Sequence, residues 1–101
     1  MQRLEQFTKC TALDLASKRI RINSIHPGAI QTPILNTVGW SNDQITKMLD
    51  DIAAKYPVGR AGEVSDISEA IAFLANDKSA SFITGIALPV DGGYVVLGSL
   101  F

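Results

Sequence analysis

The chain has 101 residues, and its nine basic and ten acidic side chains give a formal net charge of −1. This length allows one domain at most. The content of 47% hydrophobic and 19% charged residues is that of a globular protein rather than a disordered or fibrous one. A near-neutral charge argues against a nucleic-acid partner, because phosphate binding requires concentrated Lys and Arg. No apolar run approaches the roughly 18 residues of a membrane span.

The chain carries one cysteine, Cys10, and one histidine, His26. They are too few for a metal-ligand cluster or an intrachain disulfide, so no metal site is expected. We interpret Cys10 as a buried small residue and His26 as a hydrogen-bonded turn histidine, with a role near a ligand as the alternative for His26. The first residues lack the apolar core of a signal peptide, and we expect a cytoplasmic protein.

A helix is predicted over residues 3–18, because apolar residues recur there at spacings of three and four. Leu4, Phe7 and Leu15 lie on one face of this helix, and Leu13 widens it, so burial on two sides is expected.

The next segment begins with basic residues, and Lys18, Arg19 and Arg21 are interpreted as a solvated helix end. An alternating β-branched run then predicts a strand over residues 20–25, which a turn at residues 26–28 closes.

The second half of the chain alternates breakers with periodic segments. Residues 29–40 have no stable period and are predicted to form a long loop, of a kind that is often functional. The following elements are expected in order: a helix with N-cap candidates at 41–44 that runs to 53, a helix over 65–74, and a strand over 83–90. The apolar tail at residues 94–97 requires a surface to cover it.

This order of elements predicts two strands joined by a long helical crossover, which makes the strands parallel and the fold α/β. A two-stranded sheet is marginal by itself, and the strand at residues 20–25 would keep an unpaired edge. We therefore expect the chain to be incomplete.

The segment at residues 23–33 combines a turn, small residues and a hydroxyl beyond the carboxyl end of a parallel strand, where ligands bind in α/β sheets. Gly28 would let the backbone approach a flat ring. The amide of Ile30 and the hydroxyl of Thr32 could donate to a carboxamide or a phosphate. On spacing alone, a plain strand-to-loop turn is the alternative. The chain has no G-x-G-x-x-G sequence, P-loop or nucleophile elbow.

Five blocks in the same order identify a resemblance that covers nearly the whole chain. These blocks are residues 6–9 (QFTK) with 13–16 (LDLA), 20–28 (IRINSIHPG), 56–63 (YPVGRAGE), 70–75 (AIAFLA), and 82–85 (FITG) with 89–93 (PVDGG). The chain resembles the C-terminal part of the short-chain dehydrogenase/reductase family, in particular its 3-oxoacyl-carrier-protein reductase-like members. The resemblance implies the last two strands, with flanking helices, of a Rossmann-type doubly wound parallel sheet. Residues 1–101 would then be the C-terminal part of a single NAD(P)-binding domain.

The resemblance also implies roles for individual residues. The cofactor-binding residues would be Pro27, Gly28, Ala29, Ile30 and Thr32, with the backbone of Ile30 and the hydroxyl of Thr32 holding the nicotinamide end of NAD or NADP. Residues 34–56 resemble the family's substrate-covering lid.

Within this lid, Leu35, Val38 and Trp40 are candidate substrate contacts, and Trp40 is equally consistent with a plain core position. The helix from residue 65 and the last strand resemble elements with which family members form dimers and tetramers. A homotetramer, or at least a homo-oligomer, is therefore expected.

The chain departs from the family pattern in its catalytic parts. It has no Gly-rich phosphate loop, no catalytic Ser in the family's position and no Tyr-x-x-x-Lys sequence, so no catalytic residue is assigned and the chain alone is expected to be inactive. Tyr56 lies in a Pro/Gly turn and does not replace the missing tyrosine. The leading hypothesis is a fragment of an NAD(P)(H)-dependent oxidoreductase that interconverts a small-molecule carbonyl and an alcohol. The alternative is a non-catalytic remnant that acts as an association protein.

Overall fold

The computed structural model describes residues 2–100, without the side chains of residues 99 and 100. The chain divides into two compact units. Residues 1–26 and 68–89 make up the first unit, and residues 27–67 and 90–101 make up the second.

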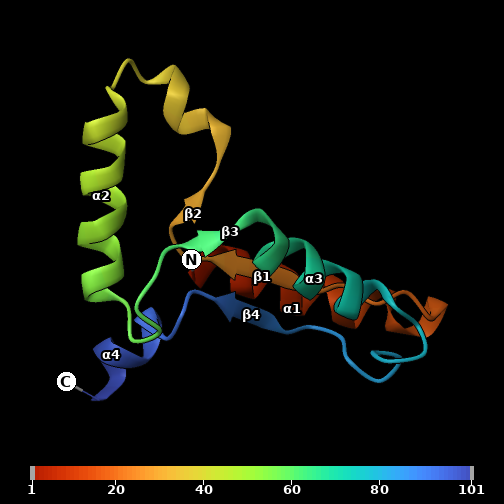
Figure 1. The fold of residues 1–101 in the computed structure, drawn as a ribbon. Coiled ribbons are helices and arrows are strands. Elements are labelled where there is room, and N and C mark those ends of the chain that lie inside the picture. Colours follow the sequence, from red (N-terminus) through yellow and green to blue (C-terminus); the bar gives the residue numbers. More distant parts are fainter. Residues whose placement is uncertain (1, 101) are drawn as a thin grey trace. The chain divides into compact units, whose positions relative to one another are not determined.

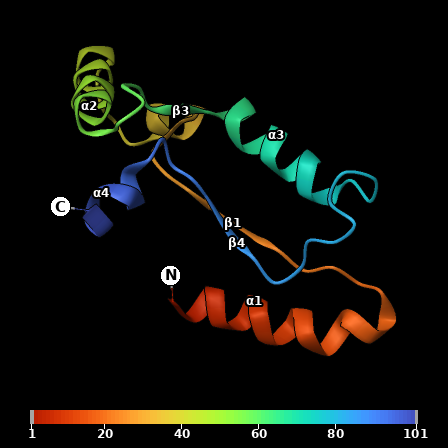
Figure 2. The same cartoon turned by 90° about the horizontal axis from the view of Figure 1, so that it is seen from below.

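The first unit is built on a pair of strands with helices beside it. Its elements are α1 (Gln2–Leu15), a 3₁₀ turn at Ala16–Lys18, most of β1 (Ser24–Pro27), the larger part of α3 (Val64–Ala75), and most of β4 (Ala87–Val90). In this unit α1 and α3 lie on opposite sides of the strand pair (Figures 1 and 2).

The pairing of β1 with β4 confirms the predicted parallel crossover. Ser24 N–H donates to Ile86 O at 3.0 Å, and Gly28 N–H donates to Val90 O at 3.0 Å. Both donor and acceptor advance by four residues, so the two strands run in the same direction.

The second unit contains β2 (Ile30–Gln31), a 3₁₀ helix at Pro33–Thr37, α2 (Asn42–Lys55), β3 (Gly62–Glu63) and α4 (Tyr94–Leu100). Strands β2 and β3 form a second parallel pair, in which Ile30 lies opposite Gly62 and Gln31 lies opposite Glu63. This short pair was not predicted.

A capping box fixes the start of α2. Ser41 Oγ accepts the N–H of Gln44 at 3.2 Å, and Gln44 Oε1 accepts the N–H of Ser41 at 2.8 Å. These two bonds satisfy amides that have no partner within the helix. The predicted helix start is confirmed.

The buried face of α1 differs from the expected one. Its buried residues are Thr8 and Ala12, whereas Phe7 is 65% exposed and Leu13 is 79% exposed. Cys10 is also exposed, so its interpretation as a buried residue is wrong. Within the part of the chain that the structure describes, α1 is not buried on two sides, so that expectation is wrong.

Arg21 is not part of a solvated helix end. Its side chain is only 17% exposed, and it donates to Leu74 O at 2.7 Å and to Ile83 O at 3.3 Å. It also pairs with the carboxylate of Asp77 at 2.9 Å. Arg21 thus satisfies the Leu74 carbonyl at the end of α3, as basic side chains commonly do at helix C-termini, and the Ile83 carbonyl in the segment before β4.

Both long strands begin later than predicted. Strand β1 starts at Ser24 and includes Pro27, and β4 starts at Ala87. Before these points the two segments are joined by one backbone bond, from Gly85 N–H to Ile22 O at 2.7 Å, and otherwise by side chains. Asn23 Nδ2 donates to Ile83 O at 3.1 Å, and its Oδ1 accepts the N–H of Ile86 at 3.1 Å.

The apolar tail, for which the sequence predicted no regular element, forms helix α4. Asp91 carries the start of this helix, because its carboxylate accepts the N–H groups of Gly93 at 3.0 Å and Val95 at 3.1 Å. Side-chain acceptors of this kind satisfy the first amides of a helix.

The buried apolar core among the described residues consists of Ala12, Leu74 and Ala80, all in the first unit. Phe82 is fully exposed. None of the helices within residues 2–100 has the length and apolar character needed to cross a bilayer.

Candidate functional site

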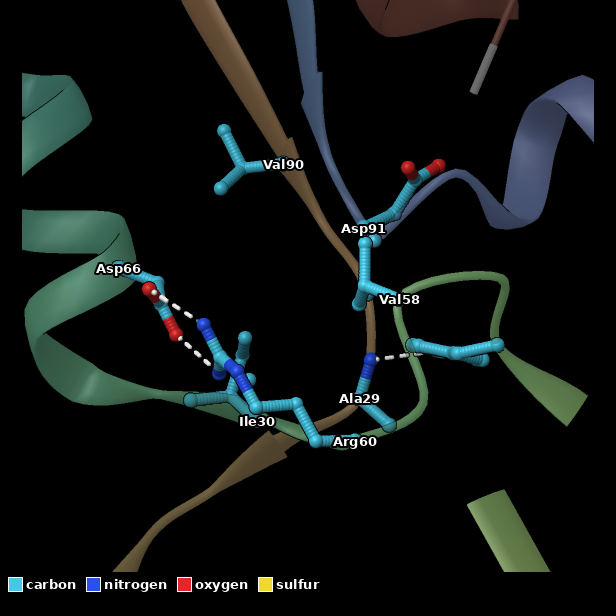
Figure 3. Close-up of a pocket in the computed structure, with 11 residues that line it drawn as sticks. Ala29, Ile30, Val58, Arg60, Asp66, Val90 and Asp91 are labelled. Carbon is cyan, nitrogen blue, oxygen red and sulfur yellow. Dashed lines mark hydrogen bonds and ion pairs between the residues drawn. The ribbon is translucent and has the colours of Figure 1, made fainter. Parts of the chain in front are cut away.

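The second unit contains a cavity of about 180 Å³, partly open to solvent, next to the turn that follows β1 (Figure 3). The turn itself, the segment between α2 and β3, the start of α3, and the end of β4 with the turn after it supply its walls. The lining residues are Gly28, Ala29, Ile30, Tyr56, Val58, Arg60, Gly62, Asp66, Val90, Asp91 and Gly92.

Three hydrogen bonds hold the turn in place. Gly28 N–H donates to Val90 O at 3.0 Å, and Ala29 O accepts the N–H of Gly62 at 2.9 Å. Ala29 N–H donates to the hydroxyl oxygen of Tyr56 at 2.7 Å. Both polar groups of the Ala29 backbone are therefore engaged by residues that follow α2 in the chain.

Gly28 lies where no side chain fits. A Cβ atom at this position would lie 2.9 Å from Asp91 Cα and 3.0 Å from the hydroxyl oxygen of Tyr56. The structure thus gives glycine at this position an internal packing reason, separate from the expected approach of a flat ring.

An ion pair forms one wall of the cavity (Figure 3). Arg60 contacts the carboxylate of Asp66 at 2.8 and 3.1 Å, and Asp66 also accepts the N–H of Glu63 at 2.7 Å. Chiefly through the hydrogen bond from Arg60, this arrangement lowers the pKa of Asp66 from 3.8 to about 2. The same pairing raises the pKa of Arg60. The pair stays charged at neutral pH and fixes the start of α3.

The parallel pairing of β2 with β3 orients the backbone of Ile30. Gly62 lies opposite Ile30 and bonds to the carbonyl of Ala29. In a parallel pair the residues that flank such a position make the inter-strand bonds, so the N–H and C=O of Ile30 point away from β3.

A second hollow, of about 400 Å³, lies in the same unit beside the 3₁₀ helix that begins at Pro33. Thr32 and Leu35 line it together with Ile45 of α2. Thr32 occupies the N-cap position of the 3₁₀ helix, but its side chain makes no capping hydrogen bond. The Thr32 hydroxyl is therefore not consumed by its own helix.

The structure brings together only some of the residues that the sequence singled out. Of the expected cofactor-binding residues, Gly28, Ala29 and Ile30 line the cavity and Thr32 lines the hollow, as does the expected lid residue Leu35. The remaining expected residues, Pro27, Val38 and Trp40, line neither. Val38 and Trp40 are both exposed.

Sequence reasoning missed Tyr56, Arg60 and Asp66 as neighbours of the turn. The first two stand in the block at residues 56–63, which carries the resemblance but no expected site role. Nothing in the local sequence shows that Tyr56 reaches a residue 27 positions earlier.

His26 lies in β1 rather than in a turn. It is buried, its Nε2 is 3.5 Å from Ser24 Oγ, and its Nδ1 is 3.8 Å from a carboxylate oxygen of Glu5. The predicted hydrogen bond of His26 is found, whereas its predicted place in a turn is wrong, because it lies in a strand of the first unit.

Comparisons with known proteins agree with this geometry. A protein-family model described as enoyl-(acyl carrier protein) reductase matches residues 2–95. The cyclohexanol dehydrogenase of Acinetobacter sp. (strain SE19) is 40% identical over 87 residues, which cover 86% of this chain and 31% of that protein.

Two solved structures of dehydrogenases also match this chain. A short-chain dehydrogenase/reductase of unknown function from Caenorhabditis elegans, solved with cofactor, matches with a TM-score of 0.84 and 34% identity, covering 94% of this chain and 36% of that one. A small-chain dehydrogenase in complex with NADPH matches with a TM-score of 0.74 and 36% identity, covering 92% of this chain and 39% of that one. The chain spans about a third of the length of these relatives.

Proposed function

The chain belongs to the short-chain dehydrogenase/reductase family, and from this premise we propose that it is the C-terminal part of an NAD(P)(H)-dependent oxidoreductase. The complete protein interconverts an alcohol and a carbonyl compound. The similarity to a cyclohexanol dehydrogenase and to a dehydrogenase solved with NADPH supports this proposal.

The observation that carries the proposal is the donor pair beyond β1. The N–H of Ile30 points away from β3, and the hydroxyl of Thr32 is unused by its own helix. A carboxamide offers one acceptor oxygen and one donor nitrogen, which an amide N–H and a hydroxyl can satisfy together. The chemistry of these two groups therefore suits the nicotinamide end of the cofactor, which supports the proposal.

The chain's own part in the reaction is to bind and orient. Pro27 ends β1 and Gly28 and Ala29 form the turn after it, and Ile30 and Thr32 would hold the carboxamide. When bound, the nicotinamide ring supplies or accepts the hydride. The proton-transferring Tyr and the phosphate-binding glycines do not occur in these 101 residues, so this part of the protein holds one side of the site.

Residues 34–56 are proposed to cover the substrate. This segment contains the 3₁₀ helix and α2, and Leu35 faces the same hollow as Thr32. In this proposal Val38 and Trp40, which are exposed in the structure, contact the substrate.

A homotetramer in the cytoplasm completes the proposal. Ile71 and Phe73 of α3, with Phe82 and Ile86 before β4, are large exposed apolar side chains of the first unit. Such residues are common where copies of a chain associate.

An assay of the natural protein that contains residues 1–101 tests the function. We expect it to reduce NAD⁺ or NADP⁺ with a secondary alcohol such as cyclohexanol, and to oxidise the reduced cofactor with the matching ketone. The absence of turnover and of binding with either cofactor would refute the oxidoreductase.

A non-catalytic association protein is the second candidate, and the exposed apolar side chains of α1, including Phe7 and Leu13, favour it. The nucleotide sequence upstream of codon 1 separates the two. An open frame that encodes a Gly-rich loop and Tyr-x-x-x-Lys supports the enzyme, whereas an in-frame stop supports the association protein.

A further inference from the structure

The turn that follows β1 is held at one point by a side chain from a distant part of the chain. Gly28 N–H and Ala29 O are bonded to backbone groups of Val90 and Gly62, whereas Ala29 N–H is bonded to the hydroxyl oxygen of Tyr56 at 2.7 Å. A backbone partner survives almost any substitution, but this bond depends on the residue type at position 56.

Tyr56 is itself firmly placed. It is the C-cap residue of α2, and its N–H donates to Ile52 O at 3.1 Å. Its carbonyl accepts the N–H of Gly59 at 2.9 Å. The ring of Tyr56 lies 5.1 Å from the ring of Tyr94, centroid to centroid, which is the separation of a favourable aromatic pair. The ring that carries the hydroxyl is therefore fixed by its contact with Tyr94 and by its position at the end of α2.

The bond between Tyr56 and Ala29 lies next to the N–H of Ile30, which is the donor in the proposed function. Ala29 and Ile30 are consecutive, so the orientation of the Ala29 peptide group limits where the N–H of Ile30 can point. Tyr56 also closes the segment 34–56, which the proposed function places over the substrate.

We propose that Tyr56 is a positioning residue for cofactor binding. Its hydroxyl fixes the Ala29 amide and thereby aims the N–H of Ile30 at the nicotinamide carboxamide. This inference rests on the proposed function, and it assigns to the end of α2 a part in cofactor affinity that is separate from covering the substrate.

Tyr94 provides a matched control. Its ring forms the other half of the same aromatic pair, and within residues 2–100 no hydrogen bond of its side chain is found. Tyr56→Phe and Tyr94→Phe each remove one hydroxyl and keep both rings. A role for ring packing alone predicts the same behaviour for both variants.

The test uses the natural protein that contains residues 1–101, and it has two arms. The first measures amide hydrogen exchange without cofactor. In Tyr56→Phe, the amide of Ala29 should exchange about three- to tenfold faster, the range that follows from losing one neutral hydrogen bond, while Gly28 and Gly62 keep their rates. The second arm measures steady-state kinetics. The KM for the cofactor should rise by about three- to tenfold, with kcat changed by less than about twofold.

Each of several results would overturn the inference. An unchanged exchange rate for Ala29 would show that the hydroxyl does not hold the amide. Faster exchange with an unchanged KM would show a bond without a positioning role. Equal effects of Tyr94→Phe, or faster exchange at Gly28 and Gly62 as well, would assign the effect to packing. If the unsubstituted protein neither binds nor turns over a cofactor, the proposed function fails first, and the exchange arm still reports on the bond to Ala29.

Discussion

Gly28 packs against the backbone of Asp91: a Cβ atom at position 28 would lie 2.9 Å from Asp91 Cα. A flexible side chain could rotate away from such a contact, but a Cα atom moves only with its backbone. The end of β1 and the turn after β4 therefore approach each other at a distance that only glycine permits.

Gly28→Ala should lower the free energy of unfolding of the natural protein by about 1–3 kcal/mol, the usual cost of overpacking a site that cannot relax. Gly98→Ala is the matched control, because nothing lies within 4 Å of a Cβ atom there and alanine is the better helix former in α4. Urea unfolding should separate the two variants. Equal stability of both would contradict the close approach of Gly28 to Asp91.

The Arg60–Asp66 pair predicts that the stability of the folded protein depends on pH in the acid range. The pKa of Asp66 is lowered from 3.8 to about 2. The stability that the charged carboxylate adds to the folded protein is therefore complete above pH 3.8 and is lost as the pH falls through about 2. Carbon NMR of the Asp66 carboxyl group should give the low pKa directly.

In Arg60→Gln the main cause of that shift is gone, and the pKa of Asp66 should return toward 3.8. High salt should weaken the pair, because both side chains are partly exposed. A pKa of 3.8 in the unsubstituted protein would be inconsistent with the bidentate contact.

Thr32→Val tests the proposed cofactor contact in the natural protein. The substitution removes a hydroxyl that its own helix does not use, so folding should be unaffected. If that hydroxyl holds the cofactor, the Michaelis constant for the cofactor should rise a few-fold to about tenfold, as expected for one lost hydrogen bond. An unchanged constant in a folded variant excludes the contact.

A polypeptide of residues 1–101 alone should be poorly folded or self-associated, and it should bind neither NAD(H) nor NADP(H). Large apolar side chains such as Phe7, Leu13 and Phe82 are exposed, while the buried apolar residues among those described are few and mostly small. Light scattering gives the size, and titration calorimetry with both reduced cofactors gives the binding. A monodisperse monomer with micromolar affinity would contradict this expectation.

The elements that were predicted correctly have local causes. The start of α2 follows from Ser41 and Gln44, which lie three residues apart and bond to each other. The parallel pairing of β1 with β4 follows from the order of the elements, because a long helical connection returns a strand in the same direction.

Two contacts that were missed join residues far apart in the sequence. Arg21 bonds to a carbonyl 53 residues later, and Tyr56 bonds to an amide 27 residues earlier. Neither contact has a sequence signal. Helix α4 was missed because Tyr94, Val95 and Val96 favour strands by propensity, whereas the Asp91 carboxylate holds the first amides in a helix. Periodicity identified the apolar residues of α1 but not which of them the rest of the chain covers.

The two bonds made by the backbone of Ala29 have a consequence for how this part of the protein can vary. Tyr56 binds its amide and Gly62 binds its carbonyl. The segment from Pro33 to Lys55 is therefore a long connection whose two ends are both fixed near Ala29. The entropic cost of closing such a loop grows only slowly with its length, by about 0.6 kcal/mol for each doubling. The length and sequence of this connection can therefore change, while the two hydrogen bonds of Ala29 keep the turn after β1 in the same position.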